Sequence, residues 1–282
     1  LSDSQSFTSK GLGVDYASEA TYFEVGASVS FAMGIDRTYQ PGDMQGFPIQ
    51  GVGLNASLMG GVSLDALGVP LMIFGNYMKI PSMSYGSMSG SLNNWGVHAQ
   101  LRLFGPDRQT TLTKVLLRWG GIAITTGIDS SHMALGLNKK IKSTFAFDNP
   151  QTTLAVTADS NATFDVDMTT RSIPLEVTTS LRLLTLLTVY GGLGFDWQLG
   201  GSSDMNLDVS AAMAGNSPQT GPVDLGTASV RAKYSADPSS AKIRGILGVQ
   251  VNLWLLRVFT QINVTNSNPM MASLAAGLRL AY

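Results

Sequence analysis

The two histidines of the chain are its most versatile candidates for acid–base or metal chemistry. His98 lies on the polar side of an alternating segment, which fits either a proton or solute site in a pore or a hydrogen-bonded structural residue. His132 follows Ser130 and Ser131, and a serine beside a histidine suggests hydrolytic chemistry. Neighbours in sequence seldom align for proton transfer, however, and the sequence shows no orienting acid. We therefore expect no enzyme, and a hydrolase at His132 stays a remote hypothesis.

Three aspartates, Asp159, Asp165 and Asp167, are close enough in sequence to suggest a calcium site. Calcium sites take several oxygen ligands from a compact loop, and no such loop pattern occurs here. A solvated acidic strand end explains them better. The glycines around Gly192 resemble part of a phosphate-binding loop but lack a following helix. We expect neither a metal nor a cofactor.

Charge restricts the partners. The net charge is −1, and the chain carries 18 Lys and Arg against 19 Asp and Glu, so nucleic acid is not expected as a partner. Lys139, Lys140 and Lys142 form one small basic cluster. It either contacts lipopolysaccharide phosphates or is a solvated charge in a loop.

A larger polar set shares a different property, because its members fall opposite apolar rows in alternating segments. Both signs of charge occur in it. Inside a barrel, such residues form either a solute-selecting constriction or a closed plug network, and the sequence leaves both open. The set comprises His98, Gln100, Arg102, Glu176, Arg182, Asp196, Arg244, Gln250, Asn252 and Arg279.

The elements that must position these residues are strands. Between Ile173 and Leu183 apolar residues alternate with Glu176, Thr178 and Arg182, which predicts a strand with one apolar face. Similar patterns recur along the chain and predict about twelve strands, with ten to fourteen as the range. We place them at 22–34, 51–65, 70–79, 93–104, 115–127, 162–183, 186–198, 204–213, 223–234, 241–254, 256–265 and 270–282. Two alternatives stay open: residues 199–240 form an external hairpin, which gives ten strands, or residues 141–158 add two.

The apolar stretches are too short for a spanning helix, which needs about 20 residues. Only helices and closed barrels satisfy every backbone group in hydrocarbon, so a membrane location requires a barrel. A soluble β-sandwich also alternates. Three features favour the barrel: segments of 12 residues or more, weakly charged faces opposite the apolar rows, and aromatic residues near strand ends. These aromatics are Phe23, Phe31, Trp95, Phe104, Trp119, Trp197, Trp254 and Tyr282.

The predicted fold class is thus an all-β, antiparallel transmembrane barrel. We expect a periplasmic amino-terminal segment at 1–21, from which an export signal has been removed, followed by one barrel over 22–282. With a periplasmic carboxyl terminus, the tight connections near 184 and 254 face the periplasm. Longer external loops are expected at 35–50, 80–92 and 128–161. The absence of cysteine excludes disulfides and thiolate metal sites.

The terminal strand adds a resemblance. Leu274, Ala276, Leu278, Leu280 and Tyr282 alternate up to a final aromatic residue. In this the chain resembles the outer-membrane β-barrel proteins of Gram-negative-type bacteria, in which such a strand is the signal for the barrel-assembly machinery. Tyrosine departs from the more usual phenylalanine. The resemblance implies an outer-membrane location, with Leu278, Leu280 and Tyr282 as the assembly signal and outer-membrane lipid as a partner.

Two functions compete, and an outer-membrane lipid hydrolase is a remote third. The leading expectation is a narrow outer-membrane channel for small polar or amphipathic solutes, in which the inward charges set selectivity. The alternative is a non-conducting barrel that anchors or scaffolds an envelope assembly, such as a secretion, adhesion or motility complex. Its protein partners would contact the methionine-rich segment 78–88 and the 128–161 region.

Overall fold

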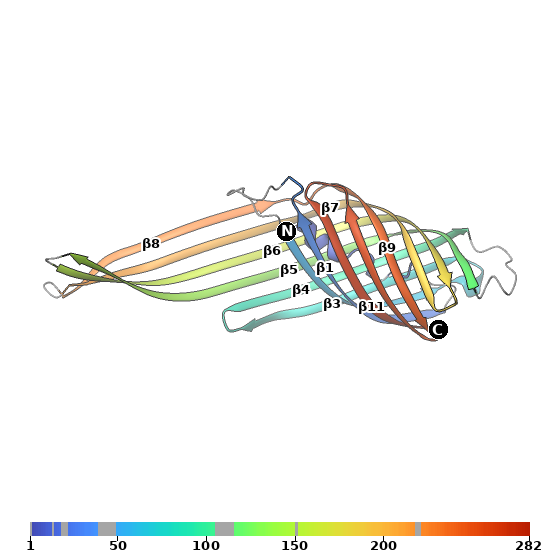
Figure 1. Ribbon diagram of the computed structural model, residues 1–282, viewed down its shortest axis with the longest axis horizontal. Helices are drawn as coiled ribbons and strands as arrows, with labels where there is room; N and C mark the ends of the chain where they lie inside the picture. Colours follow the sequence, from blue (N-terminus) through green and yellow to red (C-terminus); the bar gives the residue numbers. More distant parts are fainter. Residues whose placement is uncertain are drawn as a thin grey trace.

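The computed structural model describes residues 2–12, 14–17, 22–38, 49–104, 116–149, 152–217 and 221–282. Strands dominate these residues, and Figure 1 shows them as one continuous sheet that is rolled up at one end and drawn out at the other. The elements are α1 (Ser2–Thr8), β1 (Phe23–Ile35), β2 (Ile49–Ser63), the 3-10 turn η1 (Asp65–Leu67), β3 (Leu71–Tyr85), β4 (Met88–Phe104), β5 (Leu117–Asn149), β6 (Thr152–Leu183), β7 (Leu187–Ser217), β8 (Gly221–Ala236), β9 (Ala241–Leu253), β10 (Leu256–Thr265) and β11 (Met270–Ala281).

The sheet closes on itself. Its order is β6-β5-β4-β3-β2-β1-β11-β10-β9-β7-β8, and β6 also pairs with β7. The first half of β7 pairs with β9, while β8 pairs with the second half of β7. Of the eleven strands in the part of the chain that the structure describes, all except β8 therefore form the ring, which makes a barrel of ten. Every pairing is antiparallel, and the predicted barrel class is confirmed.

The barrel reverses the polarity of a soluble fold. On β6, Leu175 and Val177 are each about half exposed on the outer surface, whereas Glu176 and Thr178 are buried in the lumen. The same alternation runs along β9, where Arg244 and Gln250 are buried and Leu247 is exposed. Outward apolar and inward polar residues are what a lipid-embedded barrel requires.

Tight turns close one end of the barrel, which also carries the carboxyl terminus; we call this the carboxy-terminal end. The three-residue β6–β7 turn has Leu184 and Thr185 at positive φ, and the two-residue β9–β10 turn has Trp254 at positive φ, a conformation that tight hairpin turns favour. The tight connections predicted near 184 and 254 are present.

The opposite, distal end differs from expectation. The region 128–161 is not a loop: β5 and β6 continue as strands of 33 and 32 residues. Likewise, β3 and β4 run to Tyr85 and Met88, so the expected loop at 80–92 is a strand hairpin with Gly86 at positive φ in its turn. Of the loop expected at 35–50, residues 39–48 lie outside the described residues.

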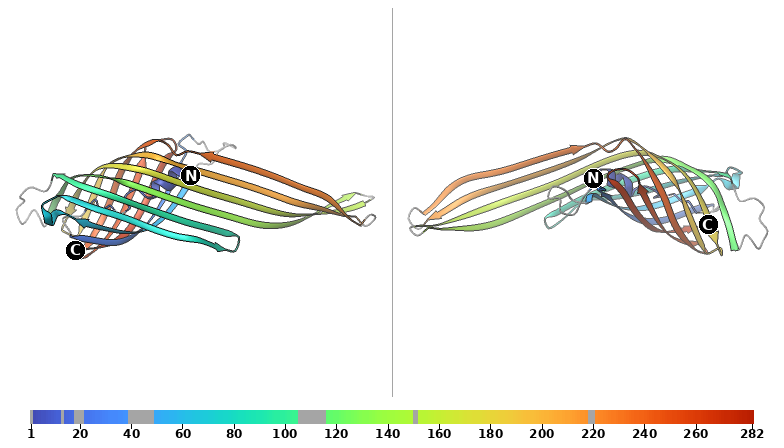
Figure 2. Two further views of the ribbon diagram at one scale, coloured as in Figure 1. Left: turned by 180° about the vertical axis from the view of Figure 1, so that it is seen from behind. Right: turned by 45° about the horizontal axis from the view of Figure 1, so that its top comes forward.

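The distal parts of β5 (133–149), β6 (152–169) and β7 (201–217), together with β8, form a long, twisted extension that we call the blade. Figure 2 shows that it projects well beyond the barrel on one side. The predicted strands at 204–213 and 223–234 belong to this extension rather than to the barrel wall. Of the two alternatives, the one that gives ten strands in the ring is therefore correct, with the hairpin in residues 199–240 outside the barrel wall. No helix in the described residues has the length and apolarity needed to cross a membrane.

Candidate functional site: a plugged lumen and a projecting blade

The amino-terminal segment fills the barrel. Phe7, Lys10 and Leu12 are each no more than 1% exposed, and the described side chains between residues 4 and 17 are all buried. Helix α1 contacts β1, β2, β5, β6, β7 and β11, which line the lumen. The expectation of a periplasmic segment at 1–21 is therefore wrong for residues 2–17. They are a plug, and we use that name for them below.

The plug runs the full height of the barrel. At the distal end, the Asp3 carboxylate lies 2.6 Å from Lys242 Nζ and accepts hydrogen bonds from the backbone and hydroxyl of Ser239. At the carboxy-terminal end, the backbone N–H of Tyr22 donates to the carbonyl of Tyr282. Its described residues, 3–12 and 14–17, thus run from the distal end of the lumen toward the carboxy-terminal end, where Asp15 lies 3.2 Å from Arg257 beside the β9–β10 turn.

A charge network in the middle of the lumen holds the plug. Lys10 Nζ lies 3.3 Å from an oxygen of Asp129 and 3.5 Å from an oxygen of Asp196, and it donates to Ser172 Oγ at 2.5 Å. Asp129 also faces His98 Nε2 at 3.2 Å. One plug cation therefore joins carboxylates from two strands of the wall, β5 and β7, which flank β6.

Arg244 extends this network along the wall. Its guanidinium lies 2.9 Å from Asp196, donates to Asn263 at 2.7 Å, and pairs with Glu176. Glu176 in turn accepts a hydrogen bond from the hydroxyl of Tyr16 in the plug. Arg244 is bound on all sides by buried acceptors, an arrangement that satisfies a buried guanidinium.

A second network lies nearer the carboxy-terminal end around Asp15 of the plug. Its carboxylate lies 3.0 Å from Arg279 and 3.2 Å from Arg257. Arg279 also donates to the carbonyl of Val14 at 2.5 Å and stacks 4.3 Å above the ring of Phe259. Burial alone would raise the pKa of Asp15, but Arg279 and Arg257 hold that pKa below its ordinary value.

The distal contact of the plug has the same electrostatic character. Burial would raise the pKa of Asp3, and the opposing charge of Lys242, with hydrogen bonds from Lys242 and Ser239, keeps it below its ordinary value. Deeper along the plug, Gln198 donates to Ser6 at 2.7 Å and Gln5 donates to Ser131 at 3.0 Å. Ion pairs thus anchor the plug at three depths.

The structure distributes the predicted lumen set unevenly. Its buried members lie inside the barrel, and they are His98, Gln100, Glu176, Asp196, Arg244, Gln250, Asn252 and Arg279. Gln250 donates to Asn252, whose amide donates to Thr188. Arg102 and Arg182 are only partly buried near the carboxy-terminal end, where Arg102 lies 3.6 Å from Asp65 and Arg182 donates to the carbonyl of Thr185.

The sequence did not reveal the residues that join the plug to the barrel wall and close the lumen. Lys10, Asp15 and Tyr16 were assigned to a segment outside the barrel, and Asp129 to an external loop. One signal was present: Thr125, Asp129 and Ser131 continue a period-two row beyond residue 127, where the predicted strand ends.

Polarity inverts where the strands leave the barrel. Trp197 on β7 and Trp95 on β4 are exposed on the outer surface at this level, and Tyr22, Phe104, Trp254 and Tyr282 are exposed near the other end. From Leu187 to Trp197, a strand tilted by about 40° rises roughly 25 Å, the height of a membrane band. Beyond this band, the face that continues the lumen wall becomes apolar and the outer face becomes polar.

The apolar face of the blade consists of residues that the pairing register places side by side. One row joins Leu137, Phe164, Leu207 and Ala232, the next joins Leu135, Val166, Met205 and Tyr234, and a third joins Lys139, Ala162, Val209 and Val230. Its base packs into a buried cluster with Leu92, Met133, Val166 and Met168. Farther out the face is uncovered: Leu137 is 40% and Val230 64% exposed.

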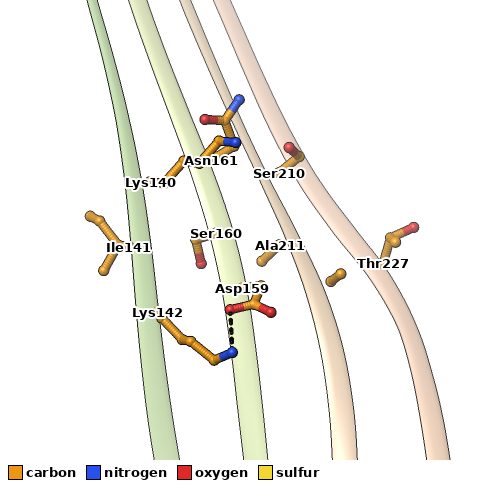
Figure 3. A pocket seen from close by; sticks show the side chains of 10 residues that line it. Lys140, Ile141, Lys142, Asp159, Ser160, Asn161, Ser210, Ala211 and Thr227 are labelled. Carbon is orange, nitrogen blue, oxygen red and sulfur yellow. Dashed lines mark ion pairs between the residues drawn. The ribbon is translucent and has the colours of Figure 1, made fainter. Parts of the chain in front are cut away.

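The polar face carries the charges. Asp208 pairs with Arg231 at 2.8 Å, and Lys142 pairs with Asp159 at 3.5 Å. Figure 3 shows a shallow hollow across the four strands, with Lys142 reaching toward Asp159 near its edge. Lys139 lies on the apolar face, while Lys140 and Lys142 lie on the polar one, so the three lysines do not form one basic patch. Asp159, Asp165 and Asp167 all lie on the polar face of β6, with Asp159 nearest the tip of the blade and Asp167 nearest the barrel.

His132 has an acid partner that the sequence did not suggest, since its Nε2 lies 3.2 Å from a carboxylate oxygen of Asp167. Ser131 points the other way, into the barrel, where Gln5 donates to it. Ser130 shares the face of His132, but within the described residues the imidazole contacts the Asp167 carboxylate, and no hydrogen bond joins it to the Ser130 hydroxyl. Within the described residues, neither Ser130 nor Ser131 is thus paired with His132 as a nucleophile with its base.

Taken with the closed ring, the outward apolar band and the polar lumen define a bacterial outer-membrane β-barrel protein. More particularly, the chain belongs to the Lsa36-like family, whose model matches residues 1–282.

Comparisons with individual proteins give distant likenesses. No curated protein matches the chain. Among solved structures, it is similar to Ail, the attachment invasion locus protein of Yersinia pestis, with 8% identity, a TM-score of 0.32, and coverage of 94% of this chain and 100% of that one. It is also similar to the toluene transporter TbuX of Ralstonia pickettii, with 7% identity, a TM-score of 0.29, and coverage of 94% and 90%. The translocator domain of the autotransporter NalP from Neisseria meningitidis gives 12% identity, a TM-score of 0.26, and the same coverage.

Proposed function

We propose that this protein is a non-conducting outer-membrane barrel that anchors the blade as a scaffold for an envelope assembly. The plug is the observation that carries this proposal. A barrel of ten strands is only slightly wider than the eight-stranded type, whose interior side chains fill, and here a whole chain segment occupies the lumen as well. The role is structural rather than catalytic.

The ion pairs of the plug support a segment that stays in the lumen rather than one that leaves it during function. Lys10 and Asp15 are buried, and both have buried partners of opposite charge on the wall. Withdrawing either residue leaves a buried charge without its partner, which costs about 3 kcal/mol or more for each pair. A selectivity constriction in an open channel would instead leave its charges in contact with water and solute.

The blade supplies the scaffold. Its four strands carry a charged face and an uncovered apolar face, whereas a channel needs no such extension. In this proposal the carboxyl terminus is periplasmic, because bacterial barrels place short turns there, and the blade then stands outside the cell. Its contacts there are with envelope partners and with the lipopolysaccharide around its base.

Conductance in planar bilayers tests the proposal. We expect no steady conductance from the full chain and steady single-channel steps from a variant that lacks residues 2–17. Heat-modifiable mobility on gels checks that the deletion variant still forms a barrel. A Lys140→Gln variant, changed on the exposed blade, is the matched control and should stay closed. Steady conductance from the full chain would overturn the proposal and restore the channel.

A further inference from the structure

We infer that the apolar face of the blade is an interface with a second copy of this chain. The inference deepens the proposed function, because it names what the projecting scaffold binds. Its starting point is the uncovered surface: Leu135, Leu137, Phe145, Leu207 and Val230 are all 38% to 64% exposed on one face. Contiguous apolar patches of this extent on a protein surface mark interaction sites.

The face is large enough for a stable dimer. Outside the buried base at Val166 and Met168, β6 and β7 pair from Ala155 to Phe164, and at about 3.3 Å per residue this run is roughly 33 Å long. Four strands about 4.8 Å apart are roughly 19 Å wide, which gives an uncovered face on the order of 600 Å². Two copies that cover this face bury about 1,200 Å² in total, which is the lower end of the range for specific, stable interfaces.

The charge pattern fits self-association. Across the rows from Leu135 to Ile141, Lys139 is the one charged residue on this face, and it lies on β5, at the side of the blade. Two copies that meet about a two-fold axis near β6 and β7 therefore bury apolar rows while both lysines stay at the rim. The result is a β-sandwich, in which two sheets pack face to face about 10 Å apart.

The position of the face argues against lipid as the occupant. The apolar face continues the inner wall of the barrel, through Thr170, Ser172 and Glu176, while the lipid-facing surface continues into the polar face. At the base of the blade, the membrane therefore borders the polar face and not the apolar face, so lipid does not cover the apolar face there. The blade projects beyond the barrel to one side (Figure 2), so most of its length is free of the barrel wall.

Site-specific photocrosslinking tests the inference with the full chain in vesicles of phosphatidylethanolamine and phosphatidylglycerol. A benzophenone amino acid replaces Leu207, in the centre of the apolar face, or Asn206, its neighbour on the polar face. We expect a covalent dimer from position 207 and at least about tenfold less from position 206. A monomer only, a lipid adduct at 207, or equal dimer yields from the two positions would overturn the inference, as would, in cells, a crosslink from 207 to a different protein.

A charge substitution provides the second measurement. Leu207→Asp places a carboxylate in the interface of each copy, whereas Asn206→Asp adds the same charge to the polar face. We expect the first to raise the dimer dissociation constant at least about tenfold and the second to leave it within about twofold. Neither substitution touches the plug, so both variants stay closed in the conductance assay. If the wild-type protein is monomeric and does not conduct, only the dimer inference is overturned. If it is dimeric and conducts, only the proposal of a plugged, non-conducting barrel is overturned.

Discussion

Lys10 Nζ lies 3.3 Å from Asp129 Oδ2, although 119 positions separate the two residues in the chain. The contact joins the plug to the barrel wall, and both side chains are no more than 3% exposed. Asp196 lies 3.5 Å from the same ammonium, so one cation serves two buried carboxylates. The fold of the wall and the closure of the lumen therefore depend on the same charge.

Neutralising this cation is expected to destabilise the plugged barrel. In Lys10→Gln, Asp129 and Asp196 lose their shared partner, and the loss of stability should be about 3 kcal/mol or more, as for other buried pairs that lose one member. Urea unfolding in detergent micelles measures it. We also expect intermittent conductance, because the middle anchor of the plug is gone.

Lys140→Gln is the matched control for this experiment, since it makes the same chemical change at an exposed position of the blade. Its stability should stay within about 0.5 kcal/mol of the wild type. Equal stabilities for the two variants would show that the Lys10 network does not hold the plug.

Acid should release the plug only at low pH. The pKa values of Asp3 and Asp15 lie below their ordinary value of 3.8 when the plug is docked, because Lys242 faces Asp3 and Arg279 and Arg257 face Asp15. A carboxyl with a depressed docked pKa contributes stability that is fully present above the ordinary pKa and is lost as the pH falls through the docked value.

Conductance recorded while the pH is lowered measures this release, and we expect openings to begin below about pH 4. Asp15→Asn should weaken docking already at neutral pH and flatten the acid response. Openings of the wild type with a midpoint above pH 5 would contradict the assignment to these two aspartates.

The sequence predicted the barrel because the physics that defines a barrel wall is local. Lipid on one side and lumen on the other impose period two, and Ile173–Leu183 shows that period as plainly in the sequence as in β6. The turns at Leu184 and Trp254 follow from the spacing between alternating runs. Inward placement of Glu176 and Arg244 follows from the same rule.

The blade escaped prediction because polarity inverts above the membrane. Period two continues through Asp129, Met133 and Leu137, but the inner row turns apolar and the outer row turns polar, so the region no longer matched the barrel pattern and was interpreted as a loop. The register also shifts between Arg171 and Ser172, opposite Leu199, which hides the continuity of β7. The plug has no period at all, and its partners are distant in sequence, so nothing local distinguishes Lys10 from a solvated lysine.

The last strand is expected to direct assembly. Leu278, Leu280 and Tyr282 are each more than half exposed on the outer surface, and the ring of Tyr282 packs 5.8 Å from that of Phe23 on the neighbouring strand. Tyr282→Ala should lower the amount of heat-modifiable barrel in outer membranes several-fold, while Tyr282→Phe should preserve it. Quantitative gels of membrane fractions measure both, and full assembly of Tyr282→Ala would remove the residue from the signal.

The side of the membrane on which the blade lies is open to direct measurement, because the chain has no cysteine and a single introduced thiol is therefore unique. Ser229 is exposed on the polar face of β8. We expect Ser229→Cys to react with a membrane-impermeant maleimide on intact cells, because the proposed topology puts the blade outside. Asp65→Cys, in η1 at the carboxy-terminal end, should react only after the outer membrane is permeabilised. The reverse pattern would place the blade in the periplasm, where it would scaffold an assembly beneath the membrane, and would leave the plugged lumen and the dimer interface to stand on their own tests.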